Sequence, residues 1–393
     1  MSEDVAMSGD VRPRRKAAFP SYVIDETIYV QGCGELIEID DPSGDVRRLL
    51  DLLDGARTVD EVADELVSGH GGLSRRDVFE AIAELDRRSL LEDAGKDRLD
   101  DSYAVERWSR NLGFFETYAT LGTGKHELQE RLQDARVGLL GLGGVGTHAS
   151  LDLAAMGVGD LRIVDYDRVE LSNLNRQILY TEEDIGRRKV ELAEARIRAF
   201  NSRIHLEAVE LRLASADDVA EVVHDRDVVI GAIDRPKMHA AVWMNEGCVR
   251  SGVPLITGGI DTQRSIHYTV LPGESGCVEC WRRSAEEHDP VGSAISTQMA
   301  EIERRQVEGE RFGQDFAAFD PLVVLHTACM LSEVVRIVTG IAPPIAAGRL
   351  LEIRFDDFQL REAERWERQP GCPVCGHVSA ARDRPPSLVG SPE

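Results

Sequence analysis

The stretch GLGGVG at 141–146 carries the clearest chemistry in the chain. It lies between an apolar run typical of a strand and a stretch typical of a helix, and Asp165 and Asp167 follow about 20 residues later. In such a turn Gly141 permits the tight bend, Gly143 lets backbone amides approach a phosphate, and the helix N-terminus adds partial positive charge. Asp165, at the end of the next strand, can accept ribose hydroxyls. The pattern predicts a nucleotide site. The glycine turn by itself does not distinguish a dinucleotide from a nucleoside triphosphate.

The segment LSNLNRQILYTEEDIGRRKVELA at 171–193 favours the triphosphate. A dehydrogenase has little need of two cations here, whereas transfer at a triphosphate builds negative charge on the α-phosphate and on the departing pyrophosphate. An isolated Arg or Lys would indicate only a solvated surface residue, but a cluster beside a nucleotide turn indicates phosphate contacts. The residues expected around ATP are Gly141, Gly143, Gly144, Gly146, Asp165, Asp167, Asn173, Arg176, Gln177 and Lys189.

The run DVVIGAID ends on Asp234, at the expected carboxyl end of another parallel strand. Acids at that edge face the ligand crevice, and beside a triphosphate they can hold Mg²⁺ directly or through water. Asp234 could also cap the helix expected to begin near Pro236. The two roles are compatible.

Two C-x-x-C pairs predict a metal site: Cys277 with Cys280, and Cys372 with Cys375. Four thiolates suit tetrahedral Zn²⁺ and leave no open position, so the metal should be structural and should pin the C-terminal segment to the domain. A redox role is the alternative. Of the remaining cysteines, Cys248 and Cys329 are expected to be buried packing residues, and Cys33 lies in a turn without an identifiable partner.

These residues require an α/β framework over 104–378. The apolar runs RVGLLG, LRIVDYD, RIHLEAVE, DVVIGAID and VPLITGGI alternate with helical stretches. That alternation predicts a Rossmann-like domain with a mostly parallel sheet and helices on both faces.

A small α+β module is expected at 20–95, between a disordered tail at 1–19 and a charged linker at 96–103. Strand-like SYVIDETIYVQGCGELIEID precedes three helical stretches, the second of which has Thr58 and Glu61 in a capping box. This order is winged-helix-like, but the module lacks a basic face, so peptide binding fits better than DNA binding. The Pro-rich end at 379–393 is expected to be disordered.

The formal net charge of -24 argues against nucleic acid and anionic membranes as partners. The start of the chain has no apolar signal region, no apolar run approaches the roughly 20 residues that span a bilayer, and the odd number of cysteines suits a reducing compartment. A cytoplasmic location is expected.

Together, GLGGVG, VDYDRVELSNLNRQ, IGRRKVELA, AID and the paired C-x-x-C motifs resemble the ThiF/MoeB/HesA adenylyltransferases, relatives of ubiquitin-activating enzymes. The resemblance implies a homodimer that uses ATP and Mg²⁺ to convert a carboxylate into an acyl-adenylate. By position, Asp165 would bind the ribose, Asn173, Arg176 and Lys189 the phosphates, and Asp234 the Mg²⁺. ERWSRNLGF resembles the segment that lends an arginine to the partner subunit's ATP, which points to Arg110.

The chain departs from that family pattern in two places. Arg235 stands where an asparagine usually follows the metal-binding Asp, so the resemblance does not fix the detail of magnesium binding. Residues 281–328 contain no cysteine, which argues against a covalent thioester in the usual loop. The adenylate is then attacked directly by a nitrogen or sulfur nucleophile, or is itself the product.

The N-terminal module resembles the PqqD-like elements that hold leader peptides, as in microcin-type enzymes that adenylate ribosomal precursor peptides. A leader strand could add to the SYVIDETIYV hairpin. The predicted function is adenylation of a carboxylate or amide of such a peptide, in a pathway that could include further enzymes. Removal of residues 1–97 is expected to weaken peptide capture and spare ATP binding. The alternatives are adenylation of a sulfur-carrier or ubiquitin-like protein, a non-catalytic scaffold that presents a peptide to a heterocyclase, and, more remotely, an NAD-dependent dehydrogenase.

Overall fold

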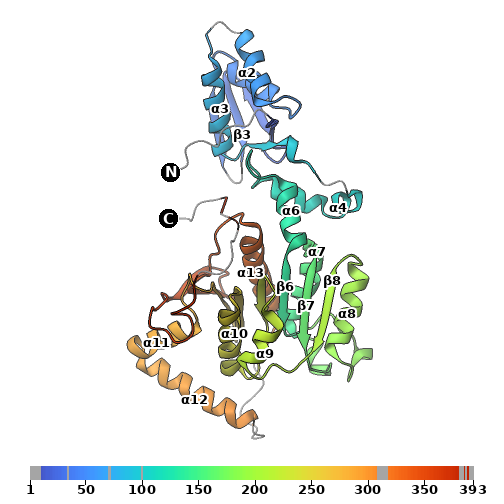
Figure 1. Cartoon of the computed structure of the whole chain (residues 1–393), viewed down its shortest axis with the longest axis vertical. Helices are drawn as coiled ribbons and strands as arrows, with labels where there is room; N and C mark the ends of the chain where they lie inside the picture. The colour runs from blue at the N-terminus through green and yellow to red at the C-terminus, as the bar shows by residue number, and fades with distance from the viewer. Residues whose placement is uncertain are drawn as a thin grey trace. The chain divides into compact units, whose positions relative to one another are not determined.

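The computed structural model describes residues 10–32, 35–69, 72–98, 101–307, 317–379, 385, 387 and 388. The chain forms two compact units, Met1–Arg131 and Leu132–Glu393 (Figure 1). The sequence places the division at 96–103, whereas the first unit extends to Arg131. Residues after the linker bond to the small module, among them Lys125 to Glu92 and Leu121 to Asp86. Cys33 lies outside the described residues.

The small module combines an antiparallel sheet of order β2-β3-β4 with three helices (Figure 1). As expected, Thr58 and Glu61 form a capping box at the start of the second helix. The apolar faces of the helices pack on Ile28 and Val30 of the sheet. The elements are β2 Ser21–Ile24, β3 Thr27–Gln31, β4 Leu36–Asp40, α1 Asp45–Leu52, α2 Val59–Ser68 and α3 Arg75–Arg87.

Part of the predicted N-terminal tail is ordered. Pro13–Arg15 form β1, which pairs antiparallel with β5, Leu91–Asp93. The prediction of disorder at 1–19 is therefore wrong for this stretch. A short basic run shows no strand pattern, and β1 exists only because a partner strand almost 80 residues away supplies its hydrogen bonds.

The first unit continues through a 3₁₀ turn and three helices, which begin around the charged linker. They are η1 Ala94–Lys96, α4 Ser102–Arg107, α5 Ser109–Glu116 and α6 Lys125–Asp134, the last of which crosses the boundary between the units. Asp101 caps α4 through the amide of Tyr103, so part of the predicted linker is the start of a helix.

The second unit contains an eight-stranded sheet of order β13-β12-β11-β10-β9-β6-β7-β8. Strands β8, β7, β6, β9 and β10 run parallel, and β11, β12 and β13 continue the sheet in antiparallel pairs. The strands are β6 Arg136–Leu140, β7 Asp160–Asp165, β8 His205–Glu210, β9 Val228–Gly231, β10 Leu255–Asp261, β11 Arg264–Val270, β12 Arg349–Arg354 and β13 Leu360–Arg365. All five predicted parallel strands are confirmed, and the strand order reverses between β6 and β9, where doubly wound sheets bind ligands.

Both faces of this sheet are covered. Successive strand residues point to opposite faces, so Leu139 lies in one apolar cluster and Leu140 in the other. The first cluster includes residues of α7, α8 and α13, and the second includes residues of α9 and α10. The helices are α7 Gly144–Met156, α8 Lys189–Phe200, α9 Ala216–Val223, α10 Lys237–Ser251, α11 Val278–His288, α12 Pro290–Val307 and α13 Asp320–Thr339, with 3₁₀ turns η2 Leu171–Asn173 and η3 Glu182–Asp184.

Among the described residues, α13 is the one helix long and apolar enough to cross a membrane by length and composition. The sequence pattern does not mark it as such because Glu333 and Arg336 interrupt its apolar run. More than half of the helix is buried, and it packs on α7, β10 and β11. Helix α13 is therefore packed as a helix of the protein core.

Candidate active site

The nucleotide turn requires glycine at two of its positions. Gly141 has a φ of +99°, and a Cβ there would lie 2.6 Å from the carbonyl oxygen of Ala232. A Cβ on Gly146 would lie 2.0 Å from the carbonyl oxygen of Gly141. Helix α7 can therefore approach the end of β6 only because both side chains are absent.

Gly143 is different, because space is open above it. A Cβ at this position would have Nε2 of Gln177 as its nearest neighbour, 3.9 Å away. Gln177 is buried, and its Oε1 has no hydrogen-bond partner among the described residues. A buried amide with unused bonding capacity beside an open turn is a place for a polar ligand. Gly144 is closed on its side by Val323 and the aliphatic part of Arg176.

Asp165 ties the turn to the end of β7. Its Oδ2 accepts a hydrogen bond from the amide of Leu142 at 2.6 Å, and its Oδ1 accepts one from the amide of Asp167 at 2.7 Å. Burial raises the pKa of Asp165, and the nearby Lys189 opposes that rise. Each carboxylate oxygen keeps a second lone pair, which is the bonding capacity that a ribose hydroxyl would need.

Lys189 lies beside these carboxylates at the start of α8. It is buried, with Nζ 3.3 Å from Oδ2 of Asp167. Its own amide bonds to the carbonyl of Asp167, and the amide of Gly186 bonds to the carbonyl of Val169. The loop before α8 is thereby held against the segment that follows β7.

Asn173 and Arg176 lie in and just after η2. The side chain of Asn173 is buried, and its Oδ1 accepts a bond from the amide of Glu170. Arg176 Nη1 bonds to the carbonyl of Ser172 and to Oδ1 of Asn175. Arg176 also approaches Gly144 through its aliphatic carbons. Arg176 therefore lies beside the glycine turn.

Asp234 follows β9 at the same edge of the sheet. Ala232, two residues earlier, bonds through its amide to the carbonyl of Leu140. The charges of Asp165, Asp167 and Asp234 all act on Tyr166, whose pKa is raised by burial first and by these acids next. The acids predicted on β7 and after β9 therefore share one neighbourhood.

Arg110 belongs to the other unit, Met1–Arg131. It is an exposed residue of α5, next to Asn111, whose Nδ2 bonds to Oε1 of Gln129. The sequence assigned it to the site only through a resemblance.

The four predicted metal ligands come together. Cys277, Cys280, Cys372 and Cys375 are buried, and their sulfur atoms lie within 4.8 Å of one another. The separations are 3.9 Å for Cys277–Cys280, 3.7 Å for Cys277–Cys372 and 3.4 Å for Cys280–Cys375. Sulfur atoms bound tetrahedrally at about 2.3 Å from zinc stand about 3.8 Å apart, so the cluster fits Zn²⁺. Among the other cysteines, Cys248 is buried as expected, whereas Cys329 is only partly buried.

Sequence reasoning missed two buried residues that support the site. Tyr180 donates a hydrogen bond to the carbonyl of Leu142 in the glycine turn. Asp184 accepts bonds from Thr181, Arg187 and Arg196, and these outweigh burial and lower its pKa to about 2. The spacing of Thr181 and Asp184 matches a capping box, which was the available signal.

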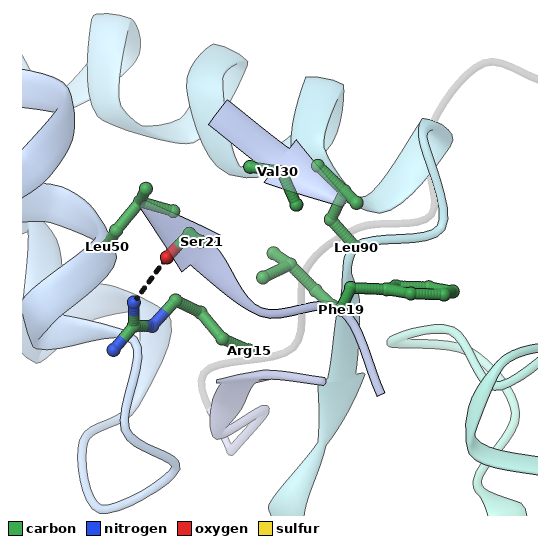
Figure 2. A pocket seen from close by; sticks show the side chains of 7 residues that line it. Arg15, Phe19, Ser21, Val30, Leu50 and Leu90 are labelled. Carbon is green, nitrogen blue, oxygen red and sulfur yellow. Dashed lines mark hydrogen bonds between the residues drawn. The ribbon is translucent and has the colours of Figure 1, made fainter. Parts of the chain in front are cut away.

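Two hollows in the small module differ in what they can hold. Figure 2 shows the first, lined by Arg15, Phe19, Ser21, Val30, Leu50 and Leu90, with Arg15 bonded to the hydroxyl of Ser21. Its volume of about 20 Å³ admits little more than a water molecule. The second, of about 270 Å³, lies at the end of β2 and is lined by residues that include Val23, Asp25 and Arg47.

Comparison with known sequences places residues 114–374 in the ThiF family. The chain is 34% identical over 265 residues to the sulfur carrier protein adenylyltransferase of Thermus thermophilus, covering 65% of this chain and 88% of that protein. It is 31% identical over 251 residues to the molybdopterin-synthase adenylyltransferase of Escherichia coli, covering 63% of this chain and 90% of the other.

Solved structures extend the likeness to the small module. MccB of E. coli aligns with a TM-score of 0.74 and 22% identity over 94% of this chain and 98% of MccB. MccB, described as a microcin C7 biosynthetic enzyme, has also been solved with ATP and with N-formylated MccA. PaaA aligns with a TM-score of 0.65 and 26% identity over 90% of this chain and 100% of PaaA.

Proposed function

This chain belongs to the ThiF family and is an ATP-dependent adenylyltransferase, and we propose that it activates a ribosomally made precursor peptide whose leader segment is held by the N-terminal module. The supporting observation is the module itself. The family match begins at residue 114, whereas the structural match to MccB covers 94% of the chain and so includes the module. Activation of a sulfur carrier is the competing proposal, favoured by the names of the sequence relatives.

The edge strand β2 offers a site for the leader. Within the described part of the chain, only its inner side pairs, with β3, and Tyr22, Val23 and Ile24 are 55%, 46% and 59% exposed. An added peptide strand would bond to the other side of β2 and cover these apolar side chains. The 270 Å³ hollow at the end of β2 can take one side chain of the leader. Anchoring the leader raises the effective concentration of the reacting end at the nucleotide.

In the proposed reaction an oxygen of the peptide carboxylate, or of an amide, attacks the α-phosphorus of ATP. The bond from that phosphorus to the bridging oxygen breaks, and pyrophosphate leaves with the electron pair. The open turn at Gly143 receives phosphate, and Asp165 holds the ribose. Arg176, Lys189 and Arg110 stabilise the negative charge that grows on the phosphate oxygens.

Two metals complete the proposal. Asp234 would hold Mg²⁺, which supplies charge neutralisation on the triphosphate. The four cysteines would hold a structural Zn²⁺ that fastens the segment near residue 372 to the start of α11. The reduced thiols of such a site suit the cytoplasmic setting that we propose.

The product either reacts with an external nitrogen or sulfur nucleophile or leaves as the adenylate. No cysteine occurs between 281 and 328, which argues against a covalent enzyme intermediate in that loop. Other enzymes of the same pathway could supply the nucleophile.

ATP–pyrophosphate exchange tests the proposal. We expect exchange with a precursor peptide encoded beside the gene, reduced at least tenfold when its leader is removed, and little exchange with a Gly-Gly-terminated carrier protein. Exchange with the carrier alone would refute the peptide proposal. Asp234→Ala should abolish exchange without loss of folding, and wild-type-like exchange in that variant would remove Asp234 from the site.

A further inference from the structure

Buried charges join the small module to the helix that carries Arg110. Nζ of Lys125, at the start of α6, lies 3.0 Å from Oε1 of Glu92 in β5 and 3.3 Å from Oε2 of Glu116 in α5. The three side chains are 15%, 3% and 11% exposed. Burial shields this bridge from solvent, so its geometry matters more than that of a surface pair.

Other bonds fasten the same end of α5 to the module. The amide of Ala18 donates to Oε1 of Glu116 at 3.1 Å, and Nζ of Lys16 donates to the carbonyl of Thr117 at 3.2 Å. A little further on, the amide of Leu121 donates to Oδ1 of Asp86 at 2.9 Å. The side chain of Leu121 is part of the module's apolar core.

Arg110 is on the same helix, six residues before Glu116, which places it about 9 Å along the axis from the anchored end. Helix α5 is short enough to move as a rigid body. The bonds at Glu116 therefore also fix the position of Arg110 at the other end of the helix. The module and Arg110 are thus parts of one body.

We propose that Lys125 and Glu116 are positioning residues that couple the peptide-holding module to Arg110. This inference rests on the proposed function, in which Arg110 stabilises the reacting phosphate. Removal of residues 1–97 takes away Glu92, Lys16 and Ala18, which are the partners of Lys125, Thr117 and Glu116. Such a truncation should impair phosphate chemistry as well as peptide capture.

The test is a double-mutant cycle in the full-length chain with Lys125→Met and Arg110→Ala. Glu92 keeps its bond from Nε of Arg14 at 2.8 Å, so Lys125→Met should fold. We expect this variant to lower kcat for ATP–pyrophosphate exchange about tenfold, with leader affinity by fluorescence anisotropy unchanged within about twofold. In the Arg110→Ala background the same change should lower kcat less than about twofold, because Lys125 acts through Arg110 and that side chain is already absent.

Two further variants guard against a general loss of folding. Lys125→Arg should restore most of kcat, and Glu116→Gln, which keeps an acceptor for the amide of Ala18, should show the same split between kcat and leader affinity. Equal losses from Lys125→Met in both backgrounds, or no loss of kcat, would overturn the inference. If only a Gly-Gly carrier supports exchange, the peptide proposal fails while the cycle is still measured with that substrate.

Discussion

At the scale of single residues, two glycines of one turn should respond oppositely to the same added methyl group. A Cβ at Gly143 meets nothing closer than 3.9 Å, so Gly143→Ala should fold normally. The methyl group would occupy the space proposed for phosphate, and ATP affinity should fall at least tenfold, or about 1.4 kcal/mol. Isothermal titration calorimetry with ATP measures the affinity, and thermal unfolding measures the fold.

The matched variants separate binding from folding. Gly146→Ala places a methyl group 2.0 Å from the carbonyl oxygen of Gly141 and should lower the unfolding temperature. Gly72→Ala, with no described atom within 4 Å, should alter neither property. Unchanged ATP affinity in Gly143→Ala would mean that phosphate does not lie over that residue.

Residue types and short spacings were enough to predict much of this site. Gly141, Gly143 and Asp165 follow a local strand–turn–helix pattern, and the four cysteines form two C-x-x-C pairs that are recognisable in the sequence. The contacts that support the site could not be predicted from short spacings. Lys125 bonds to Glu92, 33 residues away, and Lys16 bonds to Thr117, 101 residues away. Nothing in the local sequence distinguishes these cations from solvated ones.

At the scale of elements, a polar seam between β11 and α13 predicts a pH-dependent stability. Ser265 and His267 of β11 are buried against α13, where Nδ1 of His326 lies 2.9 Å from the hydroxyl of Ser265. Burial lowers the pKa of His267 to about 4 and that of His326 to about 3. Glu333 is the carboxylate of the seam and bonds to Thr269.

The sign follows from the proton counts. Unfolding returns each histidine to a pKa near 6.5, so between about pH 6.5 and pH 4 the unfolded chain binds more protons. With respect to these histidines, the free energy of unfolding should therefore be highest above pH 6.5. It should fall as the pH is lowered, by on the order of 3 kcal/mol per buried histidine. Urea denaturation at several pH values from 5 to 7.5 measures the slope.

Replacement of a buried histidine supplies the control. His267→Gln removes one titrating group, so its stability should fall less steeply between pH 6.5 and pH 5 than that of the wild type, whatever its absolute stability. An identical slope in both proteins would show that His267 does not contribute.

The cluster of four cysteines gives a second prediction about elements. Cys372→Ser removes a thiolate from the segment that follows β13, and we expect the chain to lose its one zinc and to unfold at least about 10 °C lower. Metal analysis after dialysis and thermal unfolding check both effects. Cys329→Ser, outside the cluster, should keep the metal. A wild-type protein free of zinc after expression in zinc-replete medium would contradict the assignment.

Elements with a regular apolar pattern were predicted, and those held only by distant partners were not. The parallel strands have continuous apolar runs because both of their faces are buried. Strand β13, LREAER, lies at the edge of the sheet with mostly exposed residues, so no pattern marks it. Strand β1 is three residues long and depends on β5.

At the scale of the whole molecule, we expect the chain to act as a homodimer, as the resemblance to the ThiF/MoeB/HesA adenylyltransferases implies. The segment between Asp167 and Lys189 exposes Leu171, Ile178 and Ile185, which suits an interface close to the phosphate residues. We expect light scattering to give a mass of about 87 kDa, twice the 43.4 kDa of one chain. Ile178→Glu should shift the mass toward that of the monomer and lower exchange.

Complementation tests whether Arg110 acts across such an interface. Arg110→Ala should keep only a small residual exchange and Asp234→Ala none, because each removes one part of every site. In a mixed dimer, the Arg110→Ala subunit keeps its Asp234 and receives Arg110 from its partner, so one site of the two is complete. Random mixing makes about half of the dimers mixed, and exchange should recover to roughly a quarter of the wild-type value. If Arg110 served the ATP of its own chain, every site in the mixture would lack one group, and exchange would not rise above that of the variants alone.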